Sequence, residues 1–382
     1  MKTLHIIPNL RKGGAERLVS DIVRELSTRE GIEVRLVIFR NEIAYDIEDI
    51  LHLVHIIPSS VQLSIWRKNK YNNTDLQRFI ENFQPDIIHS HLFEAEINSR
   101  SCYYPKAKWF SHSHNRMKSL RKLNFKALFS KNRLTDYYER KYLLSRYKKN
   151  GGNHVIAISK DIKAFLKSTL PHNIVKINKL ENAIDSNRFK RPRLIEEKVL
   201  FHPIKLISIG RLDTNKNHQF LLDCIFNLKN RGFQFHLSIV GEGETRPQLE
   251  QKINDLELHS EVTLAGVKDN VEEFLWQSDL YVHSALAEGF GLTLIEAMAS
   301  GLPVITIDGG GNRDLIEEGK NGFLIEKENV NLFVEKILEL KNNPALYQNM
   351  SQYAKTYAQK FDIVPYVDNL LELYKKASSC AE

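Results

Sequence analysis

The sequence contains few cysteines and no long apolar run. Cys102, Cys224 and Cys380 are odd in number and lie far apart in the 382 residues, so they predict neither a disulfide framework nor a CxxC metal pair. No stretch approaches the ~18 apolar residues of a membrane-spanning helix. These absences exclude a membrane-embedded transporter and favour a reducing cytoplasm as the location of the protein.

Two common nucleotide-binding signatures are also missing. The chain has no G-x-G-x-x-G dinucleotide fingerprint and no G-x-x-x-x-G-K-S/T phosphate loop. NAD-dependent oxidoreductases and P-loop kinases are therefore disfavoured. What is present is an ordinary globular composition, with 42% hydrophobic and 26% charged residues, which excludes a disordered or collagen-like chain.

Positive charge is concentrated in one segment. The formal net charge is +7, yet residues 116–149 alone contain twelve Lys or Arg residues against two acids, Asp136 and Glu139. Such a basic patch favours an anionic partner, which would be nucleic acid, a phosphorylated ligand or a lipid surface. A solvated helical face would have the same composition.

Short apolar, β-branched runs alternate with helix-length stretches along the whole chain. This alternation predicts parallel sheets covered on both faces, and two such series predict two doubly wound α/β domains. Residues 1–8 are apolar but stop at a proline without a small-residue cleavage site, so we expect a buried strand there and no signal peptide. The expected strands are 4–8, 34–39, 86–91, 108–112, 155–159 and 174–177 in the first half, and 205–209, 236–240, 262–265, 280–283 and 303–307 in the second.

The pattern also predicts where the domains begin and end. It breaks at residues 186–203, which we interpret as a linker between an N-terminal domain, residues 1–185, and a C-terminal domain, residues 204–362. The apolar residues of the tail have the spacing of an amphipathic helix. We expect this helix, at about residues 363–382, to cross back to the N-terminal domain.

Glycines follow two of the expected strands. Gly13 and Gly14 come after the first strand, and Gly241 and Gly243 come after the eighth. Ligands of open α/β sheets bind beyond the carboxyl ends of the strands, and glycine lets backbone N–H groups approach an anion there. A tight packing turn would need glycine as well, so these turns alone do not settle a function.

Two cations follow the seventh expected strand. Arg211 and Lys216 lie five residues apart across one loop. A planar guanidinium and a compact ammonium group at such a strand end can straddle a diphosphate.

The strongest pattern is a Glu-x7-Glu motif that begins at Glu288. Gly289 and Gly291 break the chain, and a helix is predicted from about Leu292, whose N-terminus is an anion site. Glu296 lies about one turn inside this helix, roughly 6 Å further along the axis. A diphosphate at the helix start would lie between the two carboxylates, which is the layout of a nucleotide sugar: hexose, diphosphate, ribose.

Together these motifs resemble family 4 of the retaining, nucleotide-sugar-dependent glycosyltransferases (GT4). The resemblance rests on Glu288-x7-Glu296, on Gly-Arg-Leu-x3-Lys-Asn at 210–217 and on Gly13-Gly14, which occur in the family's order and spacing. It covers essentially the whole chain. It implies the GT-B fold, an α/β architecture of two facing Rossmann-like domains with the active site in the cleft.

The resemblance implies a donor site in the C-terminal domain. Arg211 and Lys216 would neutralise the donor diphosphate and the charge that grows on it as the glycosidic bond breaks. Glu288 would hold sugar hydroxyls, and Glu296 would bind the ribose. The other implied donor contacts are Gly13, Gly14, Gly241, Gly243, Val267, Lys268, Gly289, Phe290, Gly291 and Leu292.

Histidines are implied on the acceptor side. His114 aligns with the His of the family's Thr-x-His motif, which implies a contact with a sugar hydroxyl or the phosphate beside the reacting carbon. His114, Arg211, Lys216 and Glu288 are therefore the implied catalytic residues. His89, His91, His112 and Asn115 are expected to line the acceptor.

The histidine pairs also raise the alternative of a zinc site. His112 and His114 lie two residues apart at a strand end, from which we expect diverging side chains, and no third ligand in an H-E-x-x-H motif is visible. The chain also lacks Asp-x-Asp, the metal-diphosphate pair of the other large glycosyltransferase fold. We therefore expect no cofactor and no metal requirement.

The implied reaction moves a hexose or N-acetylhexosamine from a UDP-sugar to a glycan or lipid-diphosphate-linked acceptor of a bacterial surface polysaccharide. Double displacement would need a carboxylate nucleophile beneath the sugar. The resemblance to the family does not place Glu16, Glu94 or Glu96 at that position. The resemblance thus implies front-face substitution, in which the departing phosphate oxygen accepts the acceptor's proton.

Two other functions stay open at this point. A nucleotide-sugar epimerase on the same fold would use similar diphosphate contacts, but its acid/base set is not supplied by Glu288-x7-Glu296. A non-enzymatic nucleic-acid-binding protein would use the basic segment 116–149. That segment has no RRM, OB or helix-turn-helix signature, so we expect no nucleic-acid partner.

The basic segment has a further interpretation. Its cations alternate with Leu and Phe residues, as in segments that lie in a membrane interface. We therefore expect the protein to be cytoplasmic and to dock peripherally on the inner face of the plasma membrane. A helical excursion packed on the N-terminal domain would give the same pattern.

Overall fold

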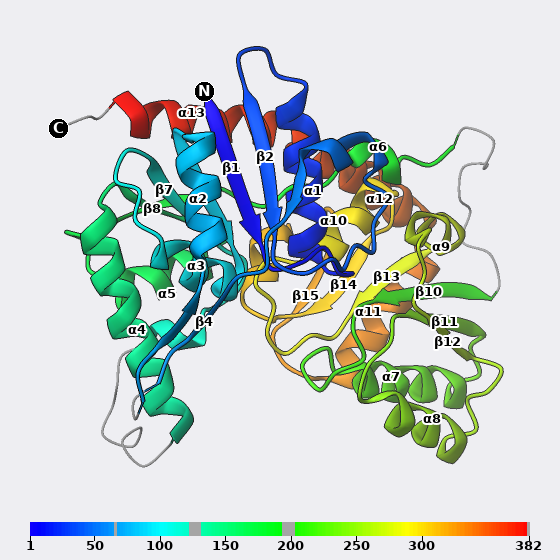
Figure 1. Cartoon of the computed structure of the whole chain (residues 1–382). Helices are drawn as coiled ribbons and strands as arrows, with labels where there is room; N and C mark the ends of the chain where they lie inside the picture. The colour runs from blue at the N-terminus through cyan, green and yellow to red at the C-terminus, as the bar shows by residue number, and fades with distance from the viewer. Residues whose placement is uncertain (65–66, 122–130, 193–202, 380–382) are drawn as a thin grey trace. The chain divides into compact units, whose positions relative to one another are not determined.

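A computed structural model describes residues 1–64, 67–121, 131–192 and 203–379 (Figure 1). The chain divides into two compact units. Unit 1 consists of Met1–Ala183 and Ile363–Glu382, and unit 2 consists of Ile184–Asp362. Each unit alternates parallel strands with helices, which confirms the predicted class of two Rossmann-like α/β domains.

Unit 1 is built on a parallel sheet whose described strands have the order β3-β2-β1-β6-β7-β8-β9. The chain moves outward from β1 to β3 and then continues on the other side of β1 with β6. This reversal places a switch point between β1 and β6, where ligands of doubly wound sheets bind. The strands are β1 (Lys2–Ile7), β2 (Glu33–Ile38), β3 (Val54–Ile56), β6 (Ile87–His91), β7 (Lys108–Ser113), β8 (Asn153–Ala157) and β9 (Val175–Lys179).

Both faces of this sheet are covered. Leu4 and Ile6 of β1 pack into one core with residues of α2 and α3, while Ile7 packs into a second core with α1 and α13. The alternation follows from the two-residue period of a strand. The helices of unit 1 are α1 (Gly14–Ser27), α2 (Thr74–Phe83), α3 (Leu92–Ser101), α4 (Lys131–Asn150), α5 (Lys160–Thr169) and α13 (Ile363–Ser379), with the short η1 (Glu48–Leu53) and η2 (Lys118–Leu120).

The last helix, α13, belongs to unit 1 although it follows unit 2 in the sequence. Its residues Val367, Leu370, Leu371 and Tyr374 are all buried in the core that contains α1. These contacts confirm the predicted amphipathic helix and its return to the N-terminal half of the chain.

Unit 2 has a second parallel sheet, with the described strands in the order β12-β11-β10-β13-β14-β15. The switch point of this sheet lies between β10 and β13. Its strands are β10 (Ile204–Ile209), β11 (Phe235–Val240), β12 (Val262–Gly266), β13 (Leu280–His283), β14 (Val304–Ile307) and β15 (Gly322–Ile325). Its helices are α6 (Ser186–Phe189), α7 (His218–Asn230), α8 (Arg246–Asp255), α9 (Val271–Gln277), α10 (Leu292–Ala299), α11 (Val330–Asn342) and α12 (Pro344–Ala358), with η4 (Gly311–Leu315) and η5 (Gln359–Phe361).

The structure adds elements that the sequence pattern did not predict. These are β3 and β15, which have three and four residues, and a hairpin of β4 (Ser60–Gln62) and β5 (Lys70–Asn72). The predicted linker contains helix α6, and its residues 193–202 lie outside the described part of the chain.

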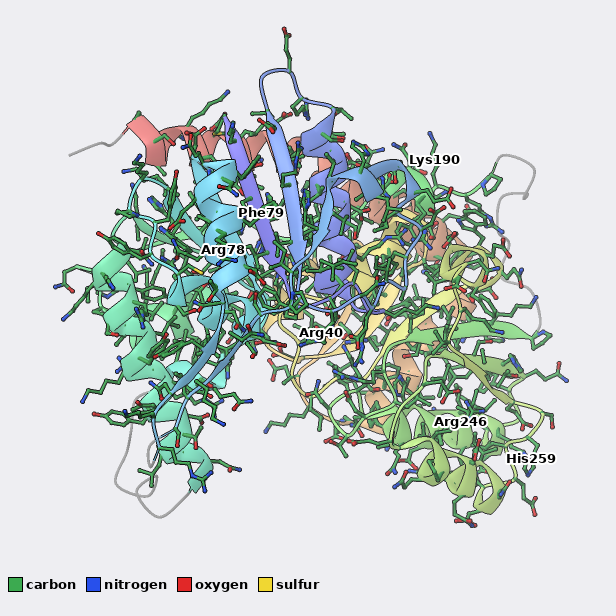
Figure 2. All side chains as sticks on the ribbon, in the orientation of Figure 1. Arg40, Arg78, Phe79, Lys190, Arg246 and His259 are labelled. Carbon is green, nitrogen blue, oxygen red and sulfur yellow. The ribbon has the colours of Figure 1, made fainter. Side chains whose placement is uncertain are left out.

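Charged side chains such as Arg78 and Arg246 lie on the surface (Figure 2). Among the described helices, none combines the length and the apolar character that crossing a membrane requires.

Candidate functional site

Two loops of unit 2 meet at its switch point. Residues 210–217 follow β10, and residues 284–291 follow β13, its parallel neighbour, so both loops leave the same edge of the sheet. Lys216 Nζ of the first loop lies 2.6 Å from Glu288 Oε2 of the second. The structure therefore brings two of the predicted site residues into direct contact.

Asp213 organises the first loop. Its Oδ1 accepts a hydrogen bond from the backbone N–H of Lys216 at 2.9 Å, and its Oδ2 lies 3.0 Å from Nε of Arg211. Asn217 then starts α7 from a left-handed backbone conformation, which Asn tolerates better than most residues. Because 78% of the Arg211 side chain is exposed, its guanidinium remains accessible to an anion at this loop.

Three groups donate hydrogen bonds to the Glu288 carboxylate. They are Lys216 Nζ, the backbone N–H of Gly289 at 3.2 Å and Nε2 of His283 at 3.2 Å. Burial alone would raise the pKa of Glu288, but the hydrogen bond from His283 and the charge of Lys216 outweigh it and lower that pKa to about 2. Glu288 is therefore a carboxylate throughout the neutral pH range.

His283 is a residue of this site that the sequence analysis missed. It ends β13, five residues before Glu288, and only 2% of its side chain is exposed. Burial lowers the pKa of His283, so the ring is neutral and its Nε2 carries the proton that Glu288 accepts. The available signal was its position at the end of the strand that precedes the Glu-x7-Glu motif.

The backbone around Glu288 is fixed by the loop after β14. The Glu288 N–H donates to the carbonyl of Gly309 at 2.7 Å, and its carbonyl accepts from Gly311 at 2.9 Å. Gly291 has a φ of 104°, which favours glycine, and α10 begins at the next residue as predicted. The Phe290 side chain is buried against the core, so this residue can offer a ligand only its backbone. Glu296 lies one turn inside α10 and is partly buried.

The other predicted donor residues lie after β11 and β12, at the same edge of the sheet. A Cβ atom on Gly241 would lie 2.0 Å from the carbonyl oxygen of Gly210, so glycine permits the close approach of the two loops. Gly243 lies similarly close to the backbone of the β10 loop. Val267 and Lys268 follow β12, and the Val267 side chain is exposed.

Five histidines meet at the carboxyl ends of β1, β6 and β7 in unit 1; we call His5, His89, His91, His112 and His114 the histidine cluster. The rings of His112 and His114 stack with centroids 4.2 Å apart and planes 7° apart. Our expectation that these two side chains diverge was wrong, because residues two apart on a strand point to the same face of the sheet.

The histidine cluster is buried and neutral. Burial lowers the pKa of His5 to about 3 and that of His112 to about 4, and it lowers the pKa values of His89, His91 and His114 well below the ordinary value. His114 is the one partly exposed member of the cluster. The structure thus joins the predicted residues His89, His91, His112 and His114 and adds His5 to them.

The glycine turn of unit 1 lies at the start of α1. Gly13 is the N-cap of α1, but its N–H donates to the hydroxyl of Tyr45 at 2.7 Å. The backbone N–H of Gly13, which we expected to approach a phosphate, is therefore bonded to Tyr45 in the structure. Nothing in the local sequence indicated this contact. Gly14 and Asn115, the residue after His114, are exposed.

Two arginines of the basic segment, Arg116 and Arg140, bind other groups of unit 1. Arg116 pairs with Asp161, and Arg140 donates to the carbonyls of Leu120 at 3.1 Å and Thr169 at 2.8 Å. Residues 122–130, which carry much of the predicted amphipathic pattern, lie outside the described residues. Among the charged side chains of α4 that the structure describes, Lys141, Lys148 and Lys149 are exposed.

Comparisons with known proteins match both halves of the chain. The model of Glycosyltransferase Family 4 matches residues 12–188, and that of Glycosyl transferases group 1 matches residues 192–357. The N-acetylgalactosamine-N,N'-diacetylbacillosaminyl-diphospho-undecaprenol 4-alpha-N-acetylgalactosaminyltransferase of Campylobacter jejuni is 25% identical, over 94% of this chain and 95% of the relative. The poly(glycerol-phosphate) alpha-glucosyltransferase of Bacillus subtilis is 30% identical, but over only 43% of this chain and 25% of its own length.

Solved structures show the same fold. Anabaena HepE in complex with UDP-glucose aligns with a TM-score of 0.76 over 98% of this chain and 100% of that chain. The sequence identity is 20%, so this likeness bears on the fold alone. The glycosyltransferase WaaG, described as involved in lipopolysaccharide biosynthesis, aligns with a TM-score of 0.70 at 17% identity. These neighbours confirm the GT-B class that the sequence predicts.

The charge arrangement around Glu288 predicts a pH-dependent contribution to stability. Its pKa in the folded chain, about 2, lies below the ~4.3 of an unfolded Glu, so the carboxylate stabilises the fold above that value and this contribution is lost as the pH falls towards 2. Glu288→Gln should lower the free energy of unfolding by about 1–3 kcal/mol at pH 7 and by about half as much at pH 3.

Denaturant unfolding at both pH values measures this difference. Glu335→Gln, at an exposed glutamate of α11, is the matched control and should change little at either pH. An equal loss of stability at pH 7 and pH 3 would show that the carboxylate charge of Glu288 is not what Lys216 and His283 stabilise.

Proposed function

The chain belongs to the glycosyltransferases that combine a Glycosyltransferase Family 4 domain with a group 1 domain, and on that premise we propose its substrates and mechanism. We propose a retaining transferase that moves a hexose or N-acetylhexosamine from a UDP-sugar to a glycan or lipid-diphosphate-linked acceptor of a surface polysaccharide. The observation that carries the donor assignment is the contact of Lys216 with Glu288 at the switch point of unit 2.

The donor diphosphate would bind between the β10 loop and the start of α10. Arg211 offers an exposed guanidinium there, Lys216 offers an ammonium group, and the N-terminus of α10 adds backbone donors. Glu296 lies one turn into α10, where it would bind the ribose hydroxyls. Structural neighbours have been solved in complex with UDP and with UDP-glucose, which supports this class of donor.

The contact of Lys216 with Glu288 would couple the sugar to the leaving group. A lysine ammonium group has three N–H donors and can keep its bond to Glu288 while another N–H meets a phosphate oxygen. Glu288 has a second oxygen, Oε1, to accept a bond from a sugar hydroxyl. One ion pair would therefore hold the two parts of the donor whose bond is broken.

Front-face substitution is the mechanism we propose. The departing phosphate oxygen takes the proton of the acceptor hydroxyl, while Arg211 and Lys216 stabilise the charge that develops on the diphosphate. Two acids of unit 1 are already engaged: Glu94 forms a bidentate pair with Arg40, and Glu96 is buried against Arg100 at 2.9 Å. These pairings argue against either carboxylate as a nucleophile for double displacement.

The acceptor would bind at the carboxyl edge of the unit 1 sheet. His114 is partly exposed there and Asn115 is exposed, so both can reach a substrate, whereas His91 and His112 are buried behind them. We propose that His114 contacts the reacting groups of the substrates. His91 and His112 would hold the His114 ring in position. The lipid-diphosphate class is supported by the Campylobacter jejuni relative, whose name includes a diphospho-undecaprenol acceptor.

Substitutions in the donor site should reduce transfer strongly. Arg211→Ala, Lys216→Ala and Glu288→Ala should each lower kcat/KM by about 10²-fold or more, since each removes a transition-state contact worth ~3 kcal/mol. Glu296→Ala should mainly raise the KM for the donor. Product release from a panel of UDP-sugars with lipid-linked acceptors measures these effects.

Arg78→Ala is the matched control, because this exposed arginine of α2 (Figure 2) pairs with Asp75 and is not part of the proposed donor site. It should leave transfer unchanged. Near-normal turnover of Arg211→Ala at saturating donor would contradict the diphosphate assignment. The same assay in EDTA, without Mg²⁺ or Mn²⁺, should retain the initial rate, because the proposed diphosphate contacts are protein cations.

The stereochemistry of the product tests the mechanism separately. A front-face reaction keeps the anomeric configuration of the donor sugar, so an α-linked UDP-sugar should give an α-linked product. Proton NMR of the newly formed linkage distinguishes the two anomers directly. A β-linked product would rule out the retaining reaction while leaving the donor site in place.

We also propose that the basic segment docks the enzyme on anionic lipid. Each cation close to such a surface contributes up to ~1 kcal/mol, an attraction that salt weakens. Flotation with phosphatidylglycerol vesicles should recover the protein at low salt and lose it at high salt. Serine substitutions in the segment should reduce recovery several-fold; the positions are Lys118, Arg121, Lys122 and Lys126.

The control carries four serine substitutions at exposed lysines of unit 2, which remove the same net charge: Lys190, Lys327, Lys355 and Lys360. This variant should float as the unchanged protein does. Equal losses in both variants would mean that net charge, and not the segment, drives binding. No flotation at low salt would exclude membrane docking altogether.

A further inference from the structure

We infer that the histidine cluster of unit 1 binds one transition-metal ion of the Zn²⁺ class, with His91 as a ligand. This inference goes beyond the proposed transferase function and does not depend on it. The ion would be held by imidazoles at the carboxyl ends of β1, β6 and β7, whereas the proposed donor contacts are the cations and backbone of unit 2.

The positions of the ring nitrogens carry the inference. Two sets of three offer ligand atoms that all lie within 4.8 Å of one another: His5, His89 and His91 form one set, and His91, His112 and His114 form the other. His91 belongs to both sets. Its Nε2 lies 3.0 Å from Nδ1 of His5, and its Nδ1 lies 3.2 Å from Nε2 of His114.

These separations suit a tetrahedral ion. Two nitrogens that bind one Zn²⁺ at about 2.0–2.1 Å are roughly 3.3 Å apart, so small ring rotations suffice to turn either contact of His91 into a pair of metal bonds. The two sets together offer more imidazoles than such an ion needs. Whichever set closes on the ion, His91 is the ligand that they share.

The hydrogen bonding of the cluster is incomplete without an ion. Within the described part of the chain, four buried ring nitrogens have no hydrogen-bond partner, and these are His5 Nε2, His89 Nε2, His112 Nδ1 and His114 Nδ1. The side chains of His5, His89 and His112 have no exposed area. A buried nitrogen lone pair without a partner is costly, and an ion would satisfy those of His89 and His112. His5 and His114 instead approach His91 through their other ring nitrogens, Nδ1 and Nε2.

Two neighbouring groups orient the rings as outer partners of metal-binding histidines do. Oδ1 of Asn182 lies 3.2 Å from Nε2 of His112, so Nε2 carries the ring proton and Nδ1 is the bare nitrogen. The hydroxyl of Tyr374 in α13 lies 2.5 Å from Nδ1 of His89 and leaves Nε2 to face the cluster. Both unpartnered nitrogens are thereby presented as ligands.

The donor set selects the class of metal. Neither set contains a carboxylate, and imidazole nitrogen suits Zn²⁺, Cu²⁺, Ni²⁺ or Co²⁺, whereas Mg²⁺ and Ca²⁺ require oxygen ligands. The partly exposed His114 provides the route by which an ion enters. A bound ion would connect three adjacent strands and stabilise unit 1.

The test uses the full chain without a histidine tag. After removal of metal with a chelator, the protein is loaded with Zn²⁺, and bound metal is measured by mass spectrometry after gel filtration. We expect one Zn²⁺ per chain. Zn²⁺ at about a hundredfold above its Kd should raise the Tm of the chain by about 3–4 °C, and Mg²⁺ should not raise it. Co²⁺ in place of Zn²⁺ should give the visible absorption of a tetrahedral nitrogen site.

His91→Gln should abolish stoichiometric Zn²⁺ binding and the Tm shift. His259→Gln is the matched control, because His259 is an exposed histidine of unit 2 (Figure 2), and it should bind Zn²⁺ as the unchanged protein does. If His91→Gln does not fold, the double variant His5→Gln/His114→Gln removes one ligand from each set and should lose the ion as well. Circular dichroism establishes which variants are folded.

Failure of the unchanged protein to retain Zn²⁺ after loading would overturn the inference, and this outcome needs no variant. Retention of one Zn²⁺ by folded His91→Gln would overturn it too. Neither result bears on the proposed donor site, which is assayed separately through the variants of unit 2. Conversely, loss of transfer in Arg211→Ala leaves the metal measurement unaffected.

Discussion

The contact between Lys216 and Glu288 is the interaction on which the account of unit 2 depends. It joins the loop after β10 to the loop after β13 across the switch point of the sheet. His283 adds a neutral donor to the same carboxylate, and the backbone of Glu288 is bonded to the loop after β14. A charged pair held from three sides is preorganised, so little reorganisation is needed when charge develops on a departing diphosphate.

In unit 1 the constraint is strand geometry, which gathers the histidines on one face of the sheet. The two-residue period of β6 and β7 directs His89, His91, His112 and His114 to one face, where His5 of β1 joins them. The cluster lies at the carboxyl edge of the sheet, beside the turn that bears the exposed Asn115. The same edge therefore carries both the proposed acceptor contacts and the inferred metal ligands, and His114 belongs to each.

The sequence predicted those features that local patterns encode. The expected strands agree with the observed ones to within a few residues, and the Glu-x7-Glu motif located the start of α10 at Leu292. β3 has only three residues, which are too few to show a period. The bond of His283 to Glu288 and that of Tyr45 to Gly13 depend on how loops fold back, which no local pattern shows. The stacking of His112 on His114 was predictable from strand geometry, and our expectation there applied the geometry wrongly.

The central claim is that Lys216 and Glu288 act on the donor as a unit. A double-mutant cycle of Lys216→Ala and Glu288→Ala, read out as kcat/KM for sugar transfer, tests it most directly. Residues that share one interaction are not additive, so the double variant should be scarcely worse than either single variant, with a coupling of about 1.5–3 kcal/mol. Losses that simply add would contradict the claim, because they would show that the two side chains contribute independently.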